Sequence, residues 1–192
     1  MRGRQATFIP GPPPSVIESR PGPGLAPRQV ALTDITVAII GTGTIGSTLA
    51  ANFAAGGQDF LLAGKVIVDP SNPVGPDGAG GYRKVIGEQE SSGQILAGLL
   101  PAGARLVKAF GTLSAPSLAA AAWREPERAV QFYAADDAAA GDLVADLIRV
   151  DGFEPVRVGG LDQAIRIEMF GDLHEFGALG RVVTESEALK AI

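Results

Sequence analysis

Three glycines, Gly41, Gly43 and Gly46, have the GxGxxG spacing that lets a backbone bind phosphate. They follow the apolar, β-branched run 36–40 and open the segment 47–55, whose apolar side chains recur on one helical face. A glycine-rich turn between a strand and a helix lets backbone N–H groups approach a diphosphate, and the helix N-terminus favours negative charge. We therefore predict a dinucleotide site made by six consecutive residues: Gly41, Thr42, Gly43, Thr44, Ile45 and Gly46.

Asp69 is the candidate for holding the ribose of such a nucleotide. Dinucleotide sites of this type place an acidic residue at the end of the second strand, about 20 residues after the glycines, to accept hydrogen bonds from the ribose hydroxyls. Asp69 ends the apolar run 65–68 and lies 28 residues after Gly41. On spacing alone, residues 65–68 are the second strand, Asp69 is the ribose ligand and the cofactor is NAD.

The composition leaves few other routes to catalysis. The chain has no cysteine and one histidine, His174, which excludes a thiolate nucleophile and leaves little material for a metal site or a Ser-His-Asp triad. We predict no catalytic residue and no metal ligand, because in hydride transfer the protein mainly binds and orients the cofactor. We expect His174 at the surface, Trp123 as a packing residue, and Asp136 or Asp137 as a helix cap.

The charge balance limits the classes of molecule that the chain is expected to bind. The chain has 16 basic and 21 acidic residues, a net charge of −5, which disfavours nucleic acid. It has no run of about 18 apolar residues, and no apolar stretch before Pro10 that would make a secretory signal. We therefore expect a cytoplasmic protein with a small-molecule partner and no membrane partner.

The elements that must position these residues lie after a tail. Residues 1–34 contain half of the 14 prolines and have no apolar periodicity, so we predict a disordered Pro/Gly-rich extension. Residues 35–192 alternate short apolar runs with helical patterns, which is typical of an α/β domain with a parallel sheet. The expected strands are 36–40, 65–68, 106–110, 129–133 and 155–158; the expected helices are 47–55, one capped by Ser91 or Ser92 with the stripe Ile95, Leu96, Leu99 and Leu100, and then 117–123, one capped by Asp136 or Asp137, and 162–179.

Four motifs, taken in order, resemble those of NADPH-dependent coenzyme F-420 (8-hydroxy-5-deazaflavin) reductases and their NADP oxidoreductase relatives. The motifs are residues 37–46, 68–73 and 107–113, and then 158–161 leading into Ala164 and Glu168. The resemblance extends over about residues 35–180. It implies a three-layer, Rossmann-like, doubly wound parallel sheet with a C-terminal helix, which binds NADP and moves hydride to or from a deazaflavin such as coenzyme F-420.

The resemblance also implies residues for the nicotinamide side of the site. They stand at the ends of two expected strands, where doubly wound sheets bind ligands. Ordinary strand-end turns are the alternative explanation for the same residues. The four are Asn72, Pro73, Ala109 and Phe110.

The chain departs from these reductases between its first two strands. In the reductases the Asp-Pro-x-Asn-Pro turn, here residues 69–73, follows the fourth strand. Here residues 62–64 run straight into 65–68, which leaves no room for a further crossover, so about one βαβ unit is missing and the sheet has fewer strands than usual. Asp69 then ends the fourth strand beside the first, is not a ribose ligand, and the crossover before it is awkward in handedness. We favour this interpretation because the later motifs match in order. Gly111 is a second departure, since many relatives have Asn there.

Two functions remain open. The first is an NADP-dependent oxidoreductase of the deazaflavin-reductase type; the second is a non-catalytic nucleotide-binding or interaction protein that arose from this fold by internal loss. A 2′-phosphate pocket would discriminate between them, and Arg83 and Lys84 are the nearest basic candidates in sequence. The C-terminal helix is expected to pack on the sheet or across a homodimer interface.

Overall fold

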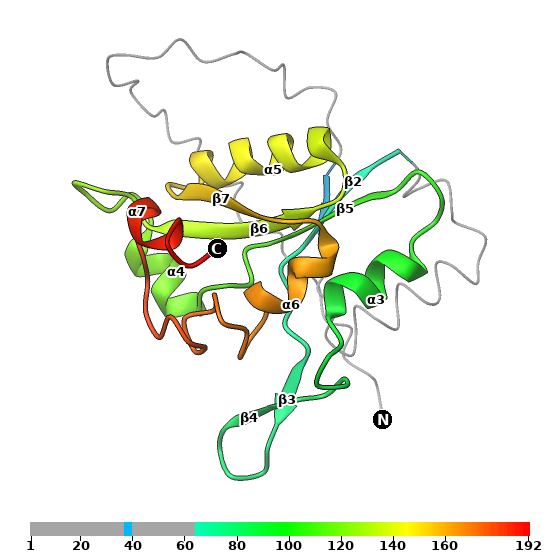
Figure 1. The fold of residues 1–192 in the computed structure, drawn as a ribbon, viewed down its shortest axis with the longest axis horizontal. Coiled ribbons are helices and arrows are strands. Elements are labelled where there is room, and N and C mark those ends of the chain that lie inside the picture. Colours follow the sequence, from blue (N-terminus) through cyan, green and yellow to red (C-terminus); the bar gives the residue numbers. More distant parts are fainter. Residues whose placement is uncertain (1–36, 40–63) are drawn as a thin grey trace, which may run out of the picture. The chain divides into compact units, whose positions relative to one another are not determined.

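The computed structural model describes residues 37–39 as a strand and residues 64–192 in full (Figure 1). The chain begins with β1 (Val37–Ile39), β2 (Val66–Asp69), β3 (Val74–Pro76), β4 (Tyr82–Lys84), α3 (Ser92–Leu99) and β5 (Arg105–Ala109). It continues with α4 (Ala115–Ala121), β6 (Val130–Ala135), α5 (Ala138–Val150), β7 (Glu154–Gly159), the 3₁₀ helix η2 (Leu161–Gln163), α6 (Ala164–Ile167) and α7 (Glu185–Ala188).

Five strands form the main sheet, in the order β1-β2-β5-β6-β7. β1, β2 and β5 are parallel, and β7 is parallel to β6, but β6 runs antiparallel to β5. The Rossmann-like α/β class is confirmed, and the sheet is mostly parallel, with the pairing of β5 and β6 as the one departure, among its described strands, from the predicted parallel arrangement.

The strand direction reverses at β6, after the short helix α4. The seven residues of α4 rise about 10 Å at 1.5 Å per residue, less than the length of the five-residue strand β5 at about 3.3 Å per residue. The antiparallel register places the start of β6 near the end where β5 stops. The 13 residues of α5 span about 20 Å, enough to return the chain for a parallel β7.

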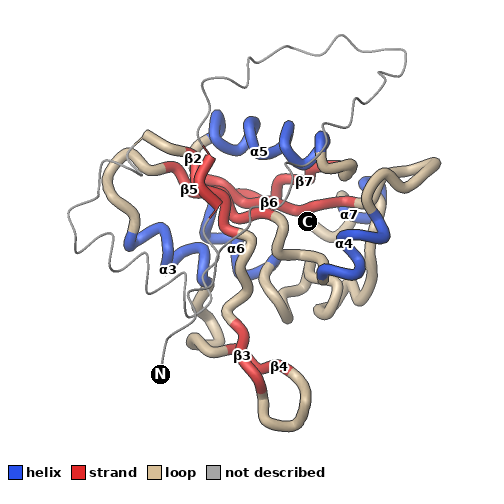
Figure 2. The backbone as a smooth tube through the Cα atoms, turned by 180° about the vertical axis from the view of Figure 1, so that it is seen from behind, coloured by secondary structure: helices blue, strands red, loops and turns tan. Residues whose placement is uncertain are grey.

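Helices cover both faces of the sheet, with α5 on one side and α3 and α6 on the other (Figures 1 and 2). Alternation along β2 fits this arrangement, because Val66 and Val68 pack in the cluster that contains α5. Ile67, between them, packs with Leu96 of α3. A strand buried on both faces is apolar throughout, as its sequence is.

Two of the open helix caps are decided by the hydrogen bonds. Ser91 is the N-cap of α3, where its hydroxyl accepts from the Gln94 N–H at 3.0 Å. Asp137 is the N-cap of α5, where its carboxylate accepts from the Ala140 N–H at 2.7 Å. The apolar stripe of α3 is only partly buried: Leu96 is 6% exposed and Leu99 is 71% exposed.

The predicted helix over 162–179 is wrong. Only η2 and α6 are helical there, and residues 168–183 fold back in turns. Two glycines permit this, since a Cβ on Gly171 would collide with the carbonyls of Ile165 and Arg166. A Cβ on Gly177 would collide with the Gly171 carbonyl. Backbone-on-backbone packing of this kind leaves no periodic pattern in a sequence.

We expect Gly177→Ala to destabilise the protein by about 1–3 kcal/mol, because the added methyl group meets backbone that cannot move aside freely. The measurement is the free energy of unfolding in urea. Gly98→Ala in α3 is the control, since no atom lies within 4 Å of the new methyl group and alanine favours helix. Equal effects of the two substitutions would contradict the packing described above.

Other predictions fall on residues that the structure does not describe. The boundary at residue 34 and the loop Gly41–Gly46 lie outside the described residues, so both stay predictions. Within residues 37–39 and 64–192, no helix combines the length and apolarity needed to cross a membrane.

Candidate functional site

The loops that follow β2 and β5 meet at the carboxyl edge of the sheet, because these strands are parallel neighbours. The side chain of Asn72 joins them: its Nδ2 donates to the Gly111 carbonyl at 2.8 Å. Its Oδ1 accepts from the Met169 N–H at 2.6 Å. Two loops and the segment after α6 thus converge on one amide side chain.

The four residues predicted for the nicotinamide side differ in what they can offer. Asn72 and Phe110 are partly buried at the edge and Pro73 is buried beside them. Ala109 is 1% exposed, with its methyl group in the core, so only its backbone can face a ligand. Phe110 has φ +63°, a left-handed conformation that is uncommon for a bulky residue and is concentrated at functional sites.

Two neighbours of Phe110 complete this loop. A Cβ on Gly111 would lie 3.2 Å from the Pro70 carbonyl oxygen, so the glycine permits the close approach of the two loops. Thr112 is buried, and its hydroxyl has no hydrogen-bond partner among the described residues. An unpaired buried hydroxyl is costly, so this position is a local weakness of the loop.

Beneath the loops lies a buried charged cluster of Lys108, Asp69 and Glu168, each at most 1% exposed. Lys108 and Asp69 are partners in the β2–β5 ladder, and Lys108 Nζ lies 2.8 Å from Asp69 Oδ2. Glu168 Oε1 lies 3.4 Å from Lys108 Nζ. Buried charges are tolerated when they are paired and hydrogen-bonded, and this cluster meets that condition.

The three ammonium hydrogens of Lys108 are all used within the cluster. Nζ donates to Asp69 Oδ2 and to the Ser92 hydroxyl, both at 2.8 Å, and to the Ser71 carbonyl at 2.6 Å. An ammonium group has three donors and no acceptor. Lys108 therefore has no hydrogen left for a substrate.

Asp69 is equally occupied, which bears on its predicted role. Its Oδ1 accepts from both the N–H and the hydroxyl of Ser71, at 2.9 and 2.6 Å, and its side chain is fully buried. The strand order agrees, because β2 lies between β1 and β5. In the order 3-2-1-4-5-6 this is the position of the fourth strand, whereas the second strand lies on the other side of the first. Both observations favour the fourth-strand interpretation, in which Asp69 is not a ribose ligand.

His174 is buried, and the prediction of a surface histidine is wrong. It is 1% exposed, and its Nδ1 accepts from the Phe176 N–H at 3.0 Å. Because Nδ1 accepts this hydrogen bond, the proton of the neutral ring is on Nε2. Burial lowers the pKa of His174, although Glu175 and the Gly111 carbonyl act in the opposite direction. The residue is thus held neutral against the loop that follows β5.

Acidification is expected to weaken the fold through His174. Because its folded-state pKa lies below the unfolded value, the unfolded chain takes up a proton first, and stability present at neutral pH is lost as pH falls below about 6.5. Protonation also removes the acceptor for the Phe176 N–H. Urea unfolding at several pH values between 8 and 5 measures this, and His174→Gln should flatten the slope. An unchanged slope would contradict a neutral, buried imidazole. Burial raises the pKa of Glu175, but hydrogen bonds from Ser117 and Ser114 outweigh it and leave the pKa below its ordinary value. Glu175 therefore also contributes stability that is lost as pH falls, at a lower pH than for His174.

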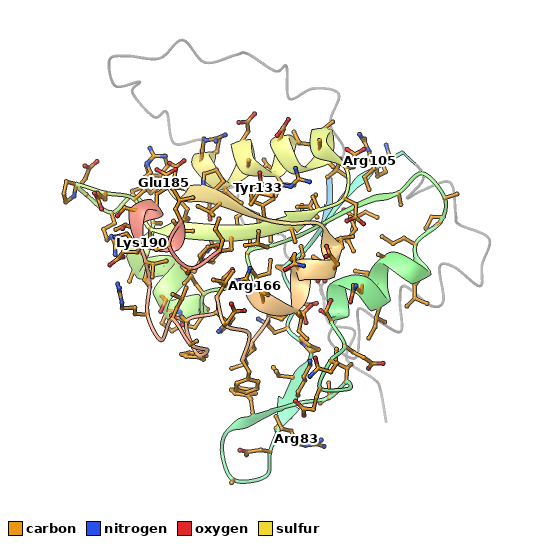
Figure 3. The ribbon with its side chains drawn as sticks, viewed as in Figure 1. Arg83, Arg105, Tyr133, Arg166, Glu185 and Lys190 are labelled. Carbon is orange, nitrogen blue, oxygen red and sulfur yellow. The ribbon has the colours of Figure 1, made fainter. Side chains whose placement is uncertain are left out.

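The two basic candidates for a 2′-phosphate both lie on β4, in the hairpin that follows β2. The Lys84 ammonium donates to the carbonyls of Glu88 and Glu90, at 2.8 and 2.7 Å, and so pins its own loop. Arg83 is exposed at the projecting hairpin (Figure 3). Trp123 is 59% exposed and carries the Arg128 guanidinium 4.9 Å from its ring centre, so it is a surface residue more than a core one.

Sequence reasoning missed the charged cluster and the segment that contributes Glu168, Met169 and His174. A Lys and an Asp inside otherwise apolar strands were the available indication. Glu168 could not be connected to them without knowing where the chain turns after α6.

The solved structures similar to this chain include one from Sinorhizobium meliloti and one from Arthrobacter. No protein-family model and no curated protein sequence matches the chain. The hypothetical protein SMa0349 from Sinorhizobium meliloti is similar over 79% of this chain and 96% of its own, with 25% identity and a TM-score of 0.56. A protein named "putative F420-dependent NADP-reductase", from Arthrobacter sp. FB24, is similar over 66% of this chain with 26% identity and a TM-score of 0.53. This chain spans 57% of the length of the Arthrobacter protein.

Proposed function

We propose that this protein is an NADP-dependent oxidoreductase that transfers hydride between NADP(H) and a deazaflavin acceptor of the coenzyme F-420 type. The observation that carries the proposal is the strand order β1-β2-β5, which puts the loops after β2 and β5 side by side at the edge where doubly wound sheets bind ligands. The similarity to the Arthrobacter protein supports the same cofactor and acceptor.

The residues at this edge fit NADP better than NAD. An acid at the ribose would repel a 2′-phosphate, and Asp69 is buried and bound to Lys108 instead. The loop Gly41–Gly46 would hold the diphosphate, and Arg83 is the basic candidate for the 2′-phosphate. The nicotinamide supplies or accepts the hydride, so the protein needs no acid or base of its own.

On the nicotinamide side, the chain's role is to bind and orient. Asn72 fixes the spacing of the loops after β2 and β5, and Pro73 and Phe110 form the wall. Ala109 contributes backbone only.

The short connection between β1 and β2 supports a second candidate function. Only residues 40–65 separate β1 from β2, and the chain spans 57% of the Arthrobacter protein. A parent fold that lost an internal segment could keep nucleotide binding, or a protein interface, without transferring hydride.

Titration with NADPH and NADH, followed by cofactor fluorescence, separates the two functions. We expect NADPH to bind in the micromolar to submillimolar range typical of enzyme substrates, and a deazaflavin acceptor to be reduced by it. No binding of either cofactor at millimolar concentration would refute the oxidoreductase. Binding without transfer to a deazaflavin would favour the second function.

Asp69→Asn tests the cofactor choice directly. Because Asp69 contacts Lys108 and Ser71, we expect the ratio of the NADPH and NADH dissociation constants to stay unchanged while the protein becomes less stable. The same titration provides the measurement. Tight NADH binding that Asp69→Asn abolishes would restore the ribose interpretation and with it NAD.

A further inference from the structure

Glu168 has an unusual position for a carboxylate, because it is buried at the start of an irregular segment and its hydrogen bonds go to α3 rather than to either candidate loop. We propose that Glu168 is a positioning residue: by docking the segment 168–175 on α3 and Lys108, it places the Met169 N–H that donates to Asn72 and, through Asn72, the Gly111 carbonyl. The segment would then form a third wall of the candidate site.

The contacts of Glu168 make this docking specific. Its Oε1 accepts from the Ser92 hydroxyl at 2.8 Å and the Gly93 N–H at 3.0 Å, and its Oε2 accepts from the Ser92 N–H at 3.2 Å. The two N–H donors are the first of α3, where negative charge is favoured. A Cβ on Gly93 would lie 2.9 Å from the Ala164 methyl group, so α3 and α6 approach closely only with glycine there.

From Glu168 the contacts lead to Asn72 by two routes. The next residue, Met169, donates its N–H to Asn72 Oδ1 at 2.6 Å. By the second route, the Lys108 ammonium pairs with the Glu168 carboxylate and also donates to the Ser71 carbonyl. Ser71 precedes Asn72 in the chain. The conformation of Asn72 therefore depends on both ends of the same charged cluster.

The end of the segment 168–175 is hydrogen-bonded to the loop that follows β5. The Glu175 N–H donates to the Thr112 carbonyl at 3.2 Å, and its carboxylate accepts from the Ser114 N–H. Loss of the Glu168 hydrogen bonds should weaken the contact between Met169 and Asn72 first, because Met169 follows Glu168 directly in the chain.

Amide hydrogen exchange, followed by NMR on the ligand-free protein, tests the proposal without any cofactor. In Glu168→Gln, which keeps the shape and loses the charge, we expect the Met169 amide to exchange about tenfold faster, the equivalent of about one hydrogen bond. The Phe132 amide in β6 should stay near its wild-type rate. Equal acceleration of both amides indicates general destabilisation and overturns the proposal, as does an unchanged Met169.

Two further variants make this measurement decisive. Asp172→Asn is the matched control, because it lies in the same segment but pairs only with Arg166, in a partly exposed ion pair; it should leave Met169 unchanged. If Glu168→Gln does not fold, Ser92→Ala removes one donor to the same carboxylate and should accelerate Met169 in the same way.

A second measurement rests on the proposed function. Glu168→Gln should weaken NADPH binding in the wild-type background and have little effect in Asn72→Leu, because both substitutions disrupt one arrangement. Independent, additive losses would overturn the positioning role. If the wild-type protein binds no NADPH, the proposed function is refuted and the exchange experiment alone decides the proposal.

Discussion

Replacing Lys108 with methionine is expected to lower the free energy of unfolding by about 3–5 kcal/mol, the cost of leaving buried charge without its partner. Asp69 and Glu168 are at most 1% exposed and would face each other as carboxylates with no cation between them. Methionine fills the space of the lysine stem, so packing changes little. Urea unfolding at pH 7 measures the loss.

A second substitution should recover part of this stability. In Lys108→Met/Glu168→Gln only one buried carboxylate remains, so we expect the double variant to be more stable than Lys108→Met alone. Arg149→Ala is the control, because the exposed pair of Arg149 and Asp146 should contribute less than about 1 kcal/mol. A loss at Lys108 no larger than at Arg149 would show that the buried cluster does not stabilise the fold.

Local patterns predicted most of the elements because the signals are local. Asp137 stands before the apolar positions Val144 and Ile148, and a cap with a helical stripe identifies α5 without any tertiary information. The reversal at β6 was not predictable in this way. A buried strand has the same apolar run in either direction, so only its pairing with β5 shows which way β6 runs.

The site was harder to predict because its geometry depends on distant residues. Asn72 was identified by its place after a strand, but its partner Met169 is 97 residues away. Asp69 was ambiguous for the same reason. Its spacing from Gly41 is compatible with the end of either the second or the fourth strand of a Rossmann-like sheet, and only the pairing of β2 with β5 distinguishes the two. His174 was misplaced because a helix was expected around it, whereas Gly171 and Gly177 turn the chain inward.

Asn72→Leu is the second substitution for which we expect a large loss in the free energy of unfolding. Leucine has nearly the same size but neither donates nor accepts, so the Gly111 carbonyl and the Met169 N–H lose their partner. Each unsatisfied group costs about 1–3 kcal/mol when buried, and both are only partly shielded here, so we expect a loss of about 2–4 kcal/mol in urea unfolding. Gln163→Leu is the control, since that amide bonds only its exposed neighbour Asp162, and it should change stability by less than about 0.5 kcal/mol.

Asn72→Asp separates the two bonds of the amide. Aspartate can still accept from the Met169 N–H, but as a carboxylate it faces the Gly111 carbonyl without a proton to donate. That arrangement favours the protonated acid, so the folded-state pKa of the new side chain should be raised. The stability gap between Asn72→Asp and the wild type should therefore narrow as pH falls, since the protonated acid donates as the amide did. Unfolding of both proteins at matched pH values measures the gap. A gap that is constant with pH, together with a stable Asn72→Leu, would show that Asn72 does not hold the two loops together.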